Sequence, residues 1–275
     1  MSIVQAIILG IVQGLTEFIP VSSTAHLILV EKVLGWNFDP DLNFAFNVLV
    51  QLGTTVAVIT YFWKDLWGIV TAVGHGLAER KPFATTEATL GWLIVIATIP
   101  AVVIGLLFKK QFAALEERPA LVAAILIVAS LLLFAAERIG RRTRPLTSVN
   151  LLDAIVIGAA QALALIPGVS RSGATLSGAL ARDLERPAAA RFSFLMSVPV
   201  LLGAGVLAIR DLLKVPNYGS LLPALLVGFV VAGIVGFISI HWLLRYLAQR
   251  PLTVFGVYRV VAGVLFLVAL LVLGR

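Results

Sequence analysis

Residues 18–26 read FIPVSSTAH, and they interrupt an apolar run that otherwise extends over residues 1–34. Residues 166–175 read IPGVSRSGAT, and they interrupt a second apolar run, 151–181, in the same way. Each interruption combines proline with hydroxylated and ionisable side chains, a composition that ends an apolar helix near its middle. In a membrane, such a break is tolerated where its backbone is buried in protein or hydrated. We therefore predict two re-entrant helix hairpins, the first over residues 1–36 and the second over 151–181.

The composition of the whole chain is that of a membrane protein. Of its 275 residues, 60% are hydrophobic and 13% are charged, and the mean hydropathy is +1.04. Soluble domains carry about twice this share of charge, so a soluble enzyme core is excluded. Cysteine is absent, which excludes thiolate metal sites and cysteine nucleophiles. Six apolar runs are long enough to cross roughly 30 Å of hydrocarbon: 42–63, 88–108, 119–136, 192–209, 220–244 and 253–273. The short mixed segment 65–78 is expected at the interface.

The two interrupted segments resemble each other. AIILGIVQGL at 6–15 aligns with AIVIGAAQAL at 154–163, an offset of 148 residues, and Ser22 falls on Ser170. This similarity indicates an internal repeat within a single membrane domain of residues 1–275, with halves 1–137 and 151–275. One hairpin and three spans make an odd number of crossings, so the second half is inverted relative to the first. The predicted fold is an all-α polytopic membrane protein with an inverted-topology repeat, six spanning helices and two re-entrant hairpins.

The net charge of +7 indicates an orientation rather than a nucleic-acid partner, because the basic residues lie in short clusters between apolar runs. The segments 64–87, 137–150, 182–191 and 245–251 carry twelve Lys and Arg, against seven on the opposite side. By the positive-inside rule these segments are cytoplasmic and both termini are external. The first hairpin then enters from outside and the second from inside, so their tips meet near the midplane.

Two ionisable residues stand at the interruptions, Glu17 and Arg171. An isolated charge at membrane depth costs about 2.5 kcal/mol or more, so we expect the two to pair with each other or with a ligand. The polar residues around them exceed what one ion pair requires: Gln13, Ser22, Ser23, Thr24 and His26 on the first tip, and Gln161, Ser170, Ser172 and Thr175 on the second.

These residue types are the inventory for phosphoryl transfer. Arg171, flanked by serines and Gly173 at the start of a predicted helix, is typical of an anion site. Gln13 and Glu17 share one helical face, where Glu17 could hold a divalent cation with the amide as a neutral oxygen ligand. His26 follows Ser23 by three residues, close enough on a helix for a base to reach a hydroxyl or a bound water.

The same motifs resemble those of a known family. QGLTEFIPVSSTAH at 13–26 and PGVSRSGAT at 167–175 look like the two signature motifs of the undecaprenyl-diphosphate phosphatase family, the bacitracin-resistance type of membrane phosphatase. FSFLMSVP at 192–199 and IPAVVIGLLF at 99–108 also resemble family segments. The resemblance implies hydrolysis of the C55 isoprenyl diphosphate to the monophosphate and inorganic phosphate, which recycles the lipid carrier of cell-wall synthesis. It further implies a location in the bacterial cytoplasmic membrane, in contact with membrane lipids, and an active site that opens to the external side. Dependence on Mg²⁺ or Ca²⁺ and a homodimer are also implied.

The resemblance also implies roles for individual residues, carried over by motif position. The implied catalytic residues are Glu17, Ser23, His26 and Arg171, and the implied cation ligands are Glu17 and Gln13. The implied substrate-binding residues are Ser22, Thr24, Ser170, Ser172, Gly173 and Thr175. Many family members have Glu where this chain has Gln13, which leaves Glu17 as the one carboxylate ligand. The nucleophile stays open among His26, Ser23 and water. Arg259, in the last span, either extends to an interface or faces inward.

A membrane transporter or lipid flippase for a phosphate-bearing anion is the alternative function. Inverted repeats with broken helices that meet at the midplane are the usual architecture of alternating access. A transporter needs an anion site, but it has no use for a histidine beside hydroxyls and a cation-binding carboxylate. Release of phosphate from an isoprenyl diphosphate therefore separates the two functions.

Overall fold

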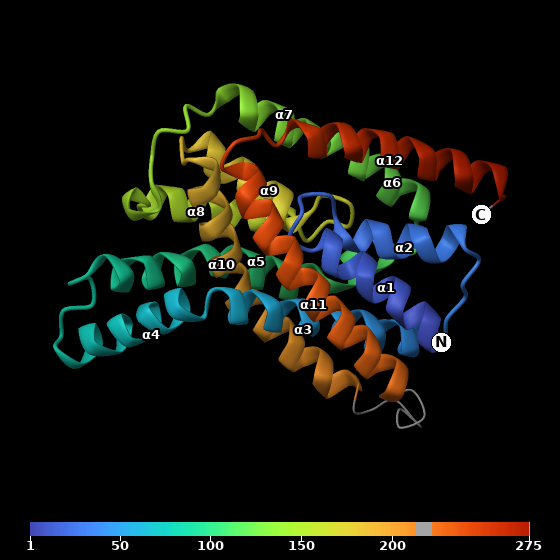
Figure 1. The fold of residues 1–275 in the computed structure, drawn as a ribbon, viewed down its shortest axis with the longest axis horizontal. Helices are drawn as coiled ribbons and strands as arrows, with labels where there is room; N and C mark the ends of the chain where they lie inside the picture. The colour runs from blue at the N-terminus through green and yellow to red at the C-terminus, as the bar shows by residue number, and fades with distance from the viewer. Residues whose placement is uncertain (213–221, 275) are drawn as a thin grey trace.

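The computed structural model describes residues 1–212 and 222–274, and over these ranges the chain is helical with no strand beyond an isolated bridge between Arg144 and Leu184. Figure 1 shows the arrangement. The elements are α1 (Ile3–Thr16), α2 (Ser23–Val33), α3 (Pro40–Tyr61), α4 (Trp63–Ala78), α5 (Thr86–Glu116), α6 (Pro119–Val128), α7 (Ser130–Ile139), the 3₁₀ turn η1 (Leu146–Ser148), α8 (Leu151–Leu163), α9 (Arg171–Ala181), α10 (Arg186–Leu212), α11 (Leu222–Leu247) and α12 (Thr253–Val272).

The six predicted spans are confirmed, because the described residues contain six helical segments long and apolar enough to cross a membrane: Leu42–Tyr61, Thr86–Glu116, Pro119–Ile139, Arg186–Val206, Leu222–Leu247 and Thr253–Val272. Residues 220–221 of the predicted fifth run lie outside the described residues. Two spans differ in detail from the expectation. The third is divided into α6 and α7 at Ala129, and α5 continues beyond 108 with a kink at Phe108. The interfacial placement of 65–78, now within α4, stays a prediction.

Both interrupted segments form a pair of short helices joined by a loop. The pairs are α1–α2 and α8–α9, and their helices begin 148 residues apart, at 3 and 151 and again at 23 and 171. Their first helices also start with the same device. Ser2 and Asn150 each accept a hydrogen bond from the third residue of the helix, whose side chain accepts one in return. This reciprocal cap satisfies two backbone donors at each helix start.

The two halves of the chain interlock through these pairs. Helix α1 packs against α11, and α8 packs against α5. Gly10 and Gly158 permit the close approach, since a Cβ would lie 2.9 Å from the carbonyl oxygen of Gly228 at the first position and 2.6 Å from that of Ala97 at the second. Neither approach leaves room for a side chain, so each short pair is fixed to the long helix of the opposite half.

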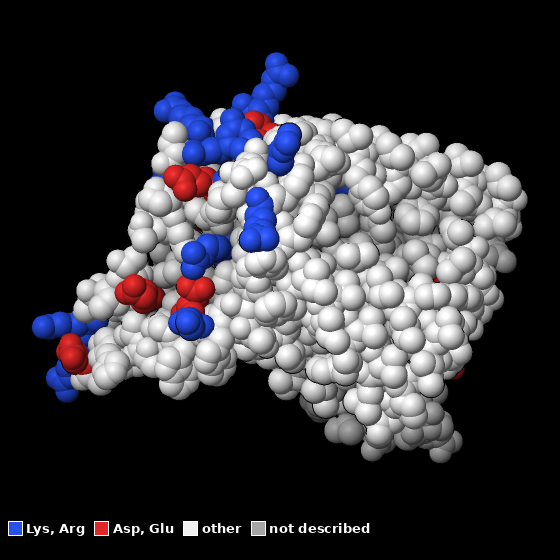
Figure 2. All heavy atoms as spheres, viewed as in Figure 1, with Lys and Arg blue, Asp and Glu red and all other residues white. Residues whose placement is uncertain are grey.

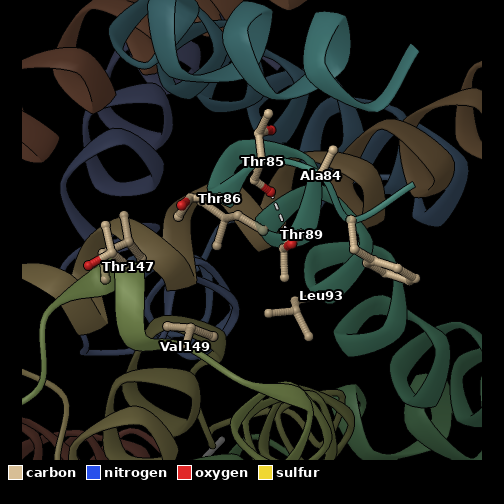
Figure 3. A pocket seen from close by; sticks show the side chains of 10 residues that line it. Ala84, Thr85, Thr86, Thr89, Leu93, Thr147 and Val149 are labelled. Atoms are coloured by element: carbon tan, nitrogen blue, oxygen red, sulfur yellow. Dashed lines mark hydrogen bonds between the residues drawn. The ribbon is translucent and has the colours of Figure 1, made fainter. Parts of the chain in front are cut away.

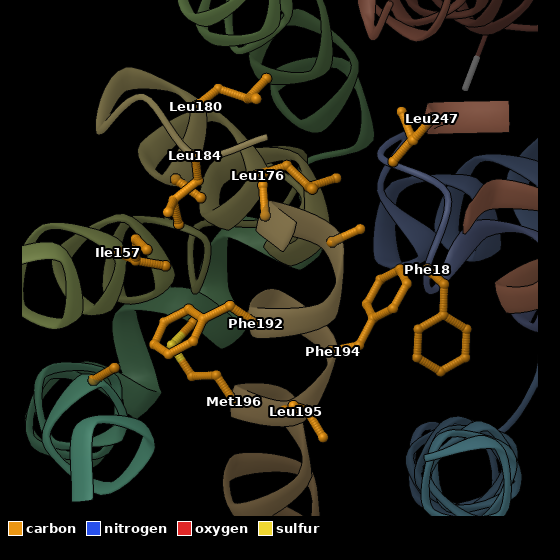
Figure 4. Packing of buried hydrophobic residues seen from close by; sticks show 14 of the residues in the cluster. Phe18, Ile157, Leu176, Leu180, Leu184, Phe192, Phe194, Leu195, Met196 and Leu247 are labelled. Carbon is orange, nitrogen blue, oxygen red and sulfur yellow. The ribbon is translucent and has the colours of Figure 1, made fainter. Parts of the chain in front are cut away.

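The largest apolar cluster lies beside the loops of the two pairs, as Figure 4 shows. Phe18, just after α1, contacts Phe194 of α10 edge to face, with ring centroids 5.4 Å apart. Phe18, Phe192 and Phe194 are completely buried. Aromatic edge-to-face contacts add about 0.5–1.5 kcal/mol to area burial. This packing fixes the position of the first loop relative to α10.

Charged side chains gather on one end of the molecule and leave the rest of the visible surface almost free of Lys, Arg, Asp and Glu (Figure 2). The buried acids at this end have arginine partners. Glu137 pairs with Arg142 and Arg186, and Asp153 pairs with Arg144 and Arg182 at 2.6–2.7 Å. These pairs tie the connection between α7 and α8 to the ends of α9 and α10. The charges of Glu137 and Asp153 are thus compensated by arginines that lie outside the two loops.

Candidate active site

The two loops end in the same unusual backbone conformation. Ser22 and Ser170, the residues before α2 and α9, have φ angles of 74° and 76°. Such a left-handed φ costs a residue with a Cβ of order 1–3 kcal/mol and persists only where surrounding contacts fix it. Each hydroxyl caps its helix, because Ser170 Oγ accepts from the Gly173 N–H at 3.2 Å and Ser22 Oγ from the Ala25 N–H at 3.5 Å. The conformation turns both helix starts toward the junction of the loops.

Glu17 and Arg171 meet at this junction. Arg171 Nη2 donates to Glu17 Oε1 at 2.8 Å, and the two side chains are 14% and 3% exposed. The other carboxylate oxygen, Oε2, accepts from Gln13 Nε2 at 3.0 Å and from the Ser23 hydroxyl at 2.7 Å. The predicted pairing of Glu17 with Arg171 is therefore present. The second guanidinium nitrogen, Arg171 Nη1, is buried and has no hydrogen-bond partner.

The hydrogen bonds of His26 go to groups other than Ser23, although the helical spacing allows the two side chains to meet. Its Nδ1 lies 2.8 Å from the carbonyl oxygen of Ser22 and its Nε2 lies 2.9 Å from the hydroxyl of Tyr258. A carbonyl only accepts, so Nδ1 carries the proton and, in the neutral ring, Nε2 accepts from the phenol. The rings of His26 and Tyr258 are also nearly parallel, 9° apart in plane and 5.7 Å between centroids. The Ser23 hydroxyl is directed to Glu17 instead.

Most of the other predicted residues of the second tip lie at the junction. Ser172 Oγ is 3.3 Å from Ser170 Oγ and donates to the carbonyl of Ile19 in the first loop at 3.3 Å. Gly173 lies in the first turn of α9. Thr175 is an exception, because its hydroxyl donates to its own helix at Arg171 O, 2.8 Å away, and contacts Ser193 of α10.

On the first tip, Thr24 occupies the first turn of α2, partly exposed. Gln161 occupies the position in α8 that Gln13 has in α1, and both are 2% exposed. Gln161 donates only a long 3.5 Å bond to the carbonyl of Ala97. The position that corresponds to Glu17, 148 residues further on, is Leu165. The matching backbones thus carry different chemistry, with the acid on one tip and the arginine on the other.

Two residues of α12 complete the junction, and the motifs did not identify either as part of it. Tyr258 contacts His26, as described above. Arg259 is completely buried and donates from Nη2 to the carbonyls of Gly168 and Val169, both at 2.9 Å. This contact decides between the two alternatives left open for Arg259, since the side chain faces inward. A basic residue in the middle of an apolar run was the available signal.

The donor set around Glu17 limits what cation it could hold. Among the described residues Glu17 is the one carboxylate at the junction, and it accepts hydrogen bonds from Gln13, Ser23 and Arg171. Within the described residues there is no group of three His, Cys, Asp or Glu side chains suited to a metal ion. Mg²⁺ is commonly held by one or two carboxylates together with substrate phosphates. The residues therefore fit a cation that is held by Glu17 and by oxygens of a bound phosphate together. They do not fit a cation site made by protein ligands alone.

A cavity of about 280 Å³ lies elsewhere, between the start of α5 and η1 (Figure 3). Hydroxyls of Thr85, Thr86, Thr89 and Thr147 line it beside apolar groups such as Leu93. The hydroxyl of Thr85 caps α5 by accepting from the Ala88 N–H at 3.1 Å. None of the predicted site residues contributes to its wall, and it contains no charged side chain. We assign it no part in the site.

The fold and this junction define a class: a polytopic α-helical membrane protein whose two interrupted segments enclose a carboxylate, a guanidinium, a histidine and several hydroxyls. The family described as "Bacitracin resistance protein BacA" matches residues 6–265. The chain belongs to this family.

Curated relatives resemble the chain over nearly its whole length. A protein of Myxococcus xanthus is 46% identical over 270 residues, which cover 98% of this chain and 90% of the relative. One of Chloroherpeton thalassium is 44% identical and covers 100% and 99%, and one of Moorella thermoacetica is 43% identical and covers 96% and 97%. Each of the three is named undecaprenyl-diphosphatase. The family resemblance of the sequence motifs is thus confirmed.

Proposed function

We propose that this protein hydrolyses undecaprenyl diphosphate to undecaprenyl phosphate and inorganic phosphate, which returns the lipid carrier of cell-wall synthesis to use. The observation that carries the proposal is the convergence of Glu17 and Arg171 on one buried point, beside the start of α9. Relatives similar over almost their full length have the name of this activity. The many exposed hydrophobic side chains, on a visible surface almost free of charge in Figure 2, suit a substrate whose isoprenyl chain stays in the membrane.

The diphosphate binds at the start of α9. Arg171 has an unused Nη1, and Ser170, Ser172 and the first N–H groups of α9 surround the same point. Gly173 adds no side chain to the first turn of α9, and a helix start favours an anion. Ser22 and Thr24, at the start of α2, face the bound phosphate from the other tip. Thr175 supports this segment through its bonds within α9.

Of the nucleophiles left open by the sequence, the contacts favour Ser23. Its hydroxyl already donates to Glu17, whereas both ring nitrogens of His26 are engaged with other groups. Ser23 Oγ attacks the terminal phosphorus and transfers its proton to Glu17, while the bond from that phosphorus to the bridging oxygen breaks. Undecaprenyl phosphate leaves with that oxygen, and Arg171 neutralises charge on the transferred group.

Water completes the reaction by attacking the phosphoserine. The bond from phosphorus to Ser23 Oγ breaks, Oγ recovers its proton from Glu17, and inorganic phosphate leaves. His26 accepts the proton of the attacking water at Nε2, the nitrogen that accepts from Tyr258 before the substrate binds, and it releases this proton to solvent when inorganic phosphate leaves. Glu17, Ser23, His26 and Arg171 each thereby have a role in one of the two steps.

The divalent cation, Mg²⁺ or Ca²⁺, is part of the proposal on the strength of the family resemblance. Glu17 would hold it together with the phosphate oxygens, and the side-chain oxygen of Gln13 would be a neutral ligand. When bound, the cation would offset the negative charge of the diphosphate.

The placement in the membrane is also proposed. At 1.5 Å per residue, α1 and α2, with 14 and 11 residues, reach about 21 Å and about 17 Å, and neither length spans roughly 30 Å of hydrocarbon. This supports two re-entrant hairpins in an inverted repeat of residues 1–137 and 151–275. The clustering of basic residues supports a cytoplasmic location for the charged end in Figure 2 and a site that opens to the external face of the bacterial cytoplasmic membrane. The homodimer rests on the family resemblance alone.

The decisive experiment measures phosphate release from undecaprenyl diphosphate by the purified protein in detergent. We expect release by the wild type, loss of release with EDTA, and recovery on adding Mg²⁺ or Ca²⁺. Activity that persists in EDTA would contradict the cation, whereas absence of release with cation present would contradict the hydrolase. A transporter would instead move the labelled lipid across a vesicle membrane without releasing phosphate.

A further inference from the structure

Arg259 is a buried cation without a counter-ion. Its side chain is 0% exposed, and no Asp or Glu among the described residues forms an ion pair with it. Nη2 donates to two carbonyls, but Nε and Nη1 have no hydrogen-bond partner. A guanidinium does not lose its proton in proteins, so this group is a full positive charge buried within the protein.

Such a charge is costly unless another group compensates it. An uncompensated buried ion costs several kcal/mol, and an ionisable residue at membrane depth marks function by default. Three of the four buried acids in the described part of the chain offer a contrast, since Glu17, Glu137 and Asp153 have arginine partners, while the fourth, Glu31, accepts a hydrogen bond from Asn43. The two carbonyls at Arg259 compensate only part of its charge. An anion that binds during the reaction would supply the rest.

The orientation of Arg259 places its charge behind the start of α9. A Cβ built on Gly173 would lie 3.0 Å from Arg259 Nη1 and 3.2 Å from Ser170 Oγ. The unpartnered nitrogen thus faces the first turn of the helix that begins with Arg171. The two carbonyls that Nη2 holds belong to Gly168 and Val169, directly before the strained Ser170.

We propose that Arg259 is a positioning residue of the diphosphate site. Its Nη2 group holds the carbonyls of residues 168 and 169, which keeps Ser170 in its left-handed conformation and α9 directed at the substrate. Its uncompensated charge favours binding of an anion at that helix start. This inference deepens the proposed function and rests on it for the identity of the substrate, but not for the anion site.

The test uses inorganic diphosphate as the probe and the full-length protein in detergent. In Arg259→Met, we expect binding of inorganic diphosphate, measured by calorimetry, to weaken at least about tenfold, as loss of charge-assisted stabilisation implies, and KM for undecaprenyl diphosphate to rise more than kcat falls. Arg259→Lys keeps the charge and loses the fork, so it should show an intermediate loss. The matched control is Arg186→Met, which removes an arginine paired with Glu137 away from the loops.

A purely structural role predicts a different pattern. In that case Arg259→Met and Arg186→Met would lower the thermal unfolding temperature while the folded fraction bound inorganic diphosphate with wild-type affinity, and this result would overturn the inference. If Arg259→Met fails to fold, Arg259→Lys decides, and wild-type affinity together with wild-type KM in that variant would equally refute it. Absence of hydrolysis by the wild type would refute the proposed function while the binding measurement still tested Arg259.

Discussion

The Glu17 carboxylate and the Arg171 guanidinium lie 2.8 Å apart across 154 residues of sequence, and they join the loops of the two short helix pairs. The contact has two consequences. It compensates two buried charges, and it keeps Arg171 from binding a phosphate with its full set of donors. A phosphate that enters the junction therefore competes with Glu17 for the guanidinium, so the resting pair is a closed form of the proposed site.

Removing the charge of Glu17 should abolish most activity. We expect Glu17→Gln to lower kcat/KM at least about 100-fold, because the variant keeps the size of the side chain but loses its charge and one of its two acceptor atoms and cannot accept the proton of Ser23. Phosphate release under saturating cation measures the effect, with Glu87→Gln, in the exposed first turn of α5, as the control. A rate within threefold of the wild type would rule out the proposed role.

Gln13→Glu should strengthen cation dependence. The substitution places a second carboxylate at the position from which Gln13 Nε2 now donates to Glu17 at 3.0 Å. Two carboxylates this close repel each other unless a cation or proton lies between them. We expect a lower Mg²⁺ concentration at half-maximal activity and a larger loss in EDTA. Gln161→Glu, at the matching position of α8, controls for burying an extra acid, and an unchanged Mg²⁺ response in Gln13→Glu would exclude a cation at Glu17.

Tyr258 should matter less than the histidine it contacts. Tyr258→Phe removes the hydroxyl that lies 2.9 Å from His26 Nε2 and keeps the stacked ring. A net hydrogen bond contributes about 1 kcal/mol, or roughly fivefold, whereas a general base contributes about 100-fold or more. We therefore expect kcat to fall about fivefold in Tyr258→Phe and at least about 100-fold in His26→Ala. Equal losses in the two variants would assign the proton transfer to Tyr258 instead.

The ion pairs at the charged end should contribute to stability according to their burial. Asp153→Asn leaves Arg144 and Arg182 without their completely buried partner, and breaking a buried pair costs about 3–5 kcal/mol. Asp65→Asn breaks the exposed pair with Arg191, worth less than about 1 kcal/mol. Thermal unfolding in detergent should show a clear decrease for the first variant and almost none for the second. Similar decreases would contradict this ranking.

Cysteine labelling tests the orientation, and the natural absence of cysteine makes it direct. Single cysteines at the exposed positions Asn37 and Ala113 should react with an impermeant thiol reagent added to intact cells, because both are proposed to be external. Thr143→Cys, exposed in the connection between α7 and α8, should react only after the cells are opened. The opposite pattern would invert the topology and move the opening of the site to the cytoplasm.

The sequence predicted the spans and the location of the breaks for physical reasons. Crossing hydrocarbon requires a minimum apolar length, and proline together with clustered hydroxyls favours a helix break, as at both loops. The cost of burying Glu17 and Arg171 then required partners, and each proved to be the other's. The direction of the Ser23 hydroxyl was less predictable. Whether it donates to Glu17 or to His26 depends on side-chain rotamers and on which groups already bind the ring nitrogens of His26.

The contribution of α12 could not be predicted from the chain alone. Apart from Tyr258 and Arg259 its sequence is apolar around the whole helix, so no periodic pattern supports the one signal, a basic residue, for which side faces protein and which faces lipid. Packing of α12 against α6 and α7 sets that rotation, and it directs Arg259 to the carbonyls before α9 and Tyr258 to His26. The sequence by itself determined a membrane protein with two broken segments and a charged residue at each break. Only the tertiary structure decided which groups surround those charges, because these contacts join residues that no local periodicity relates.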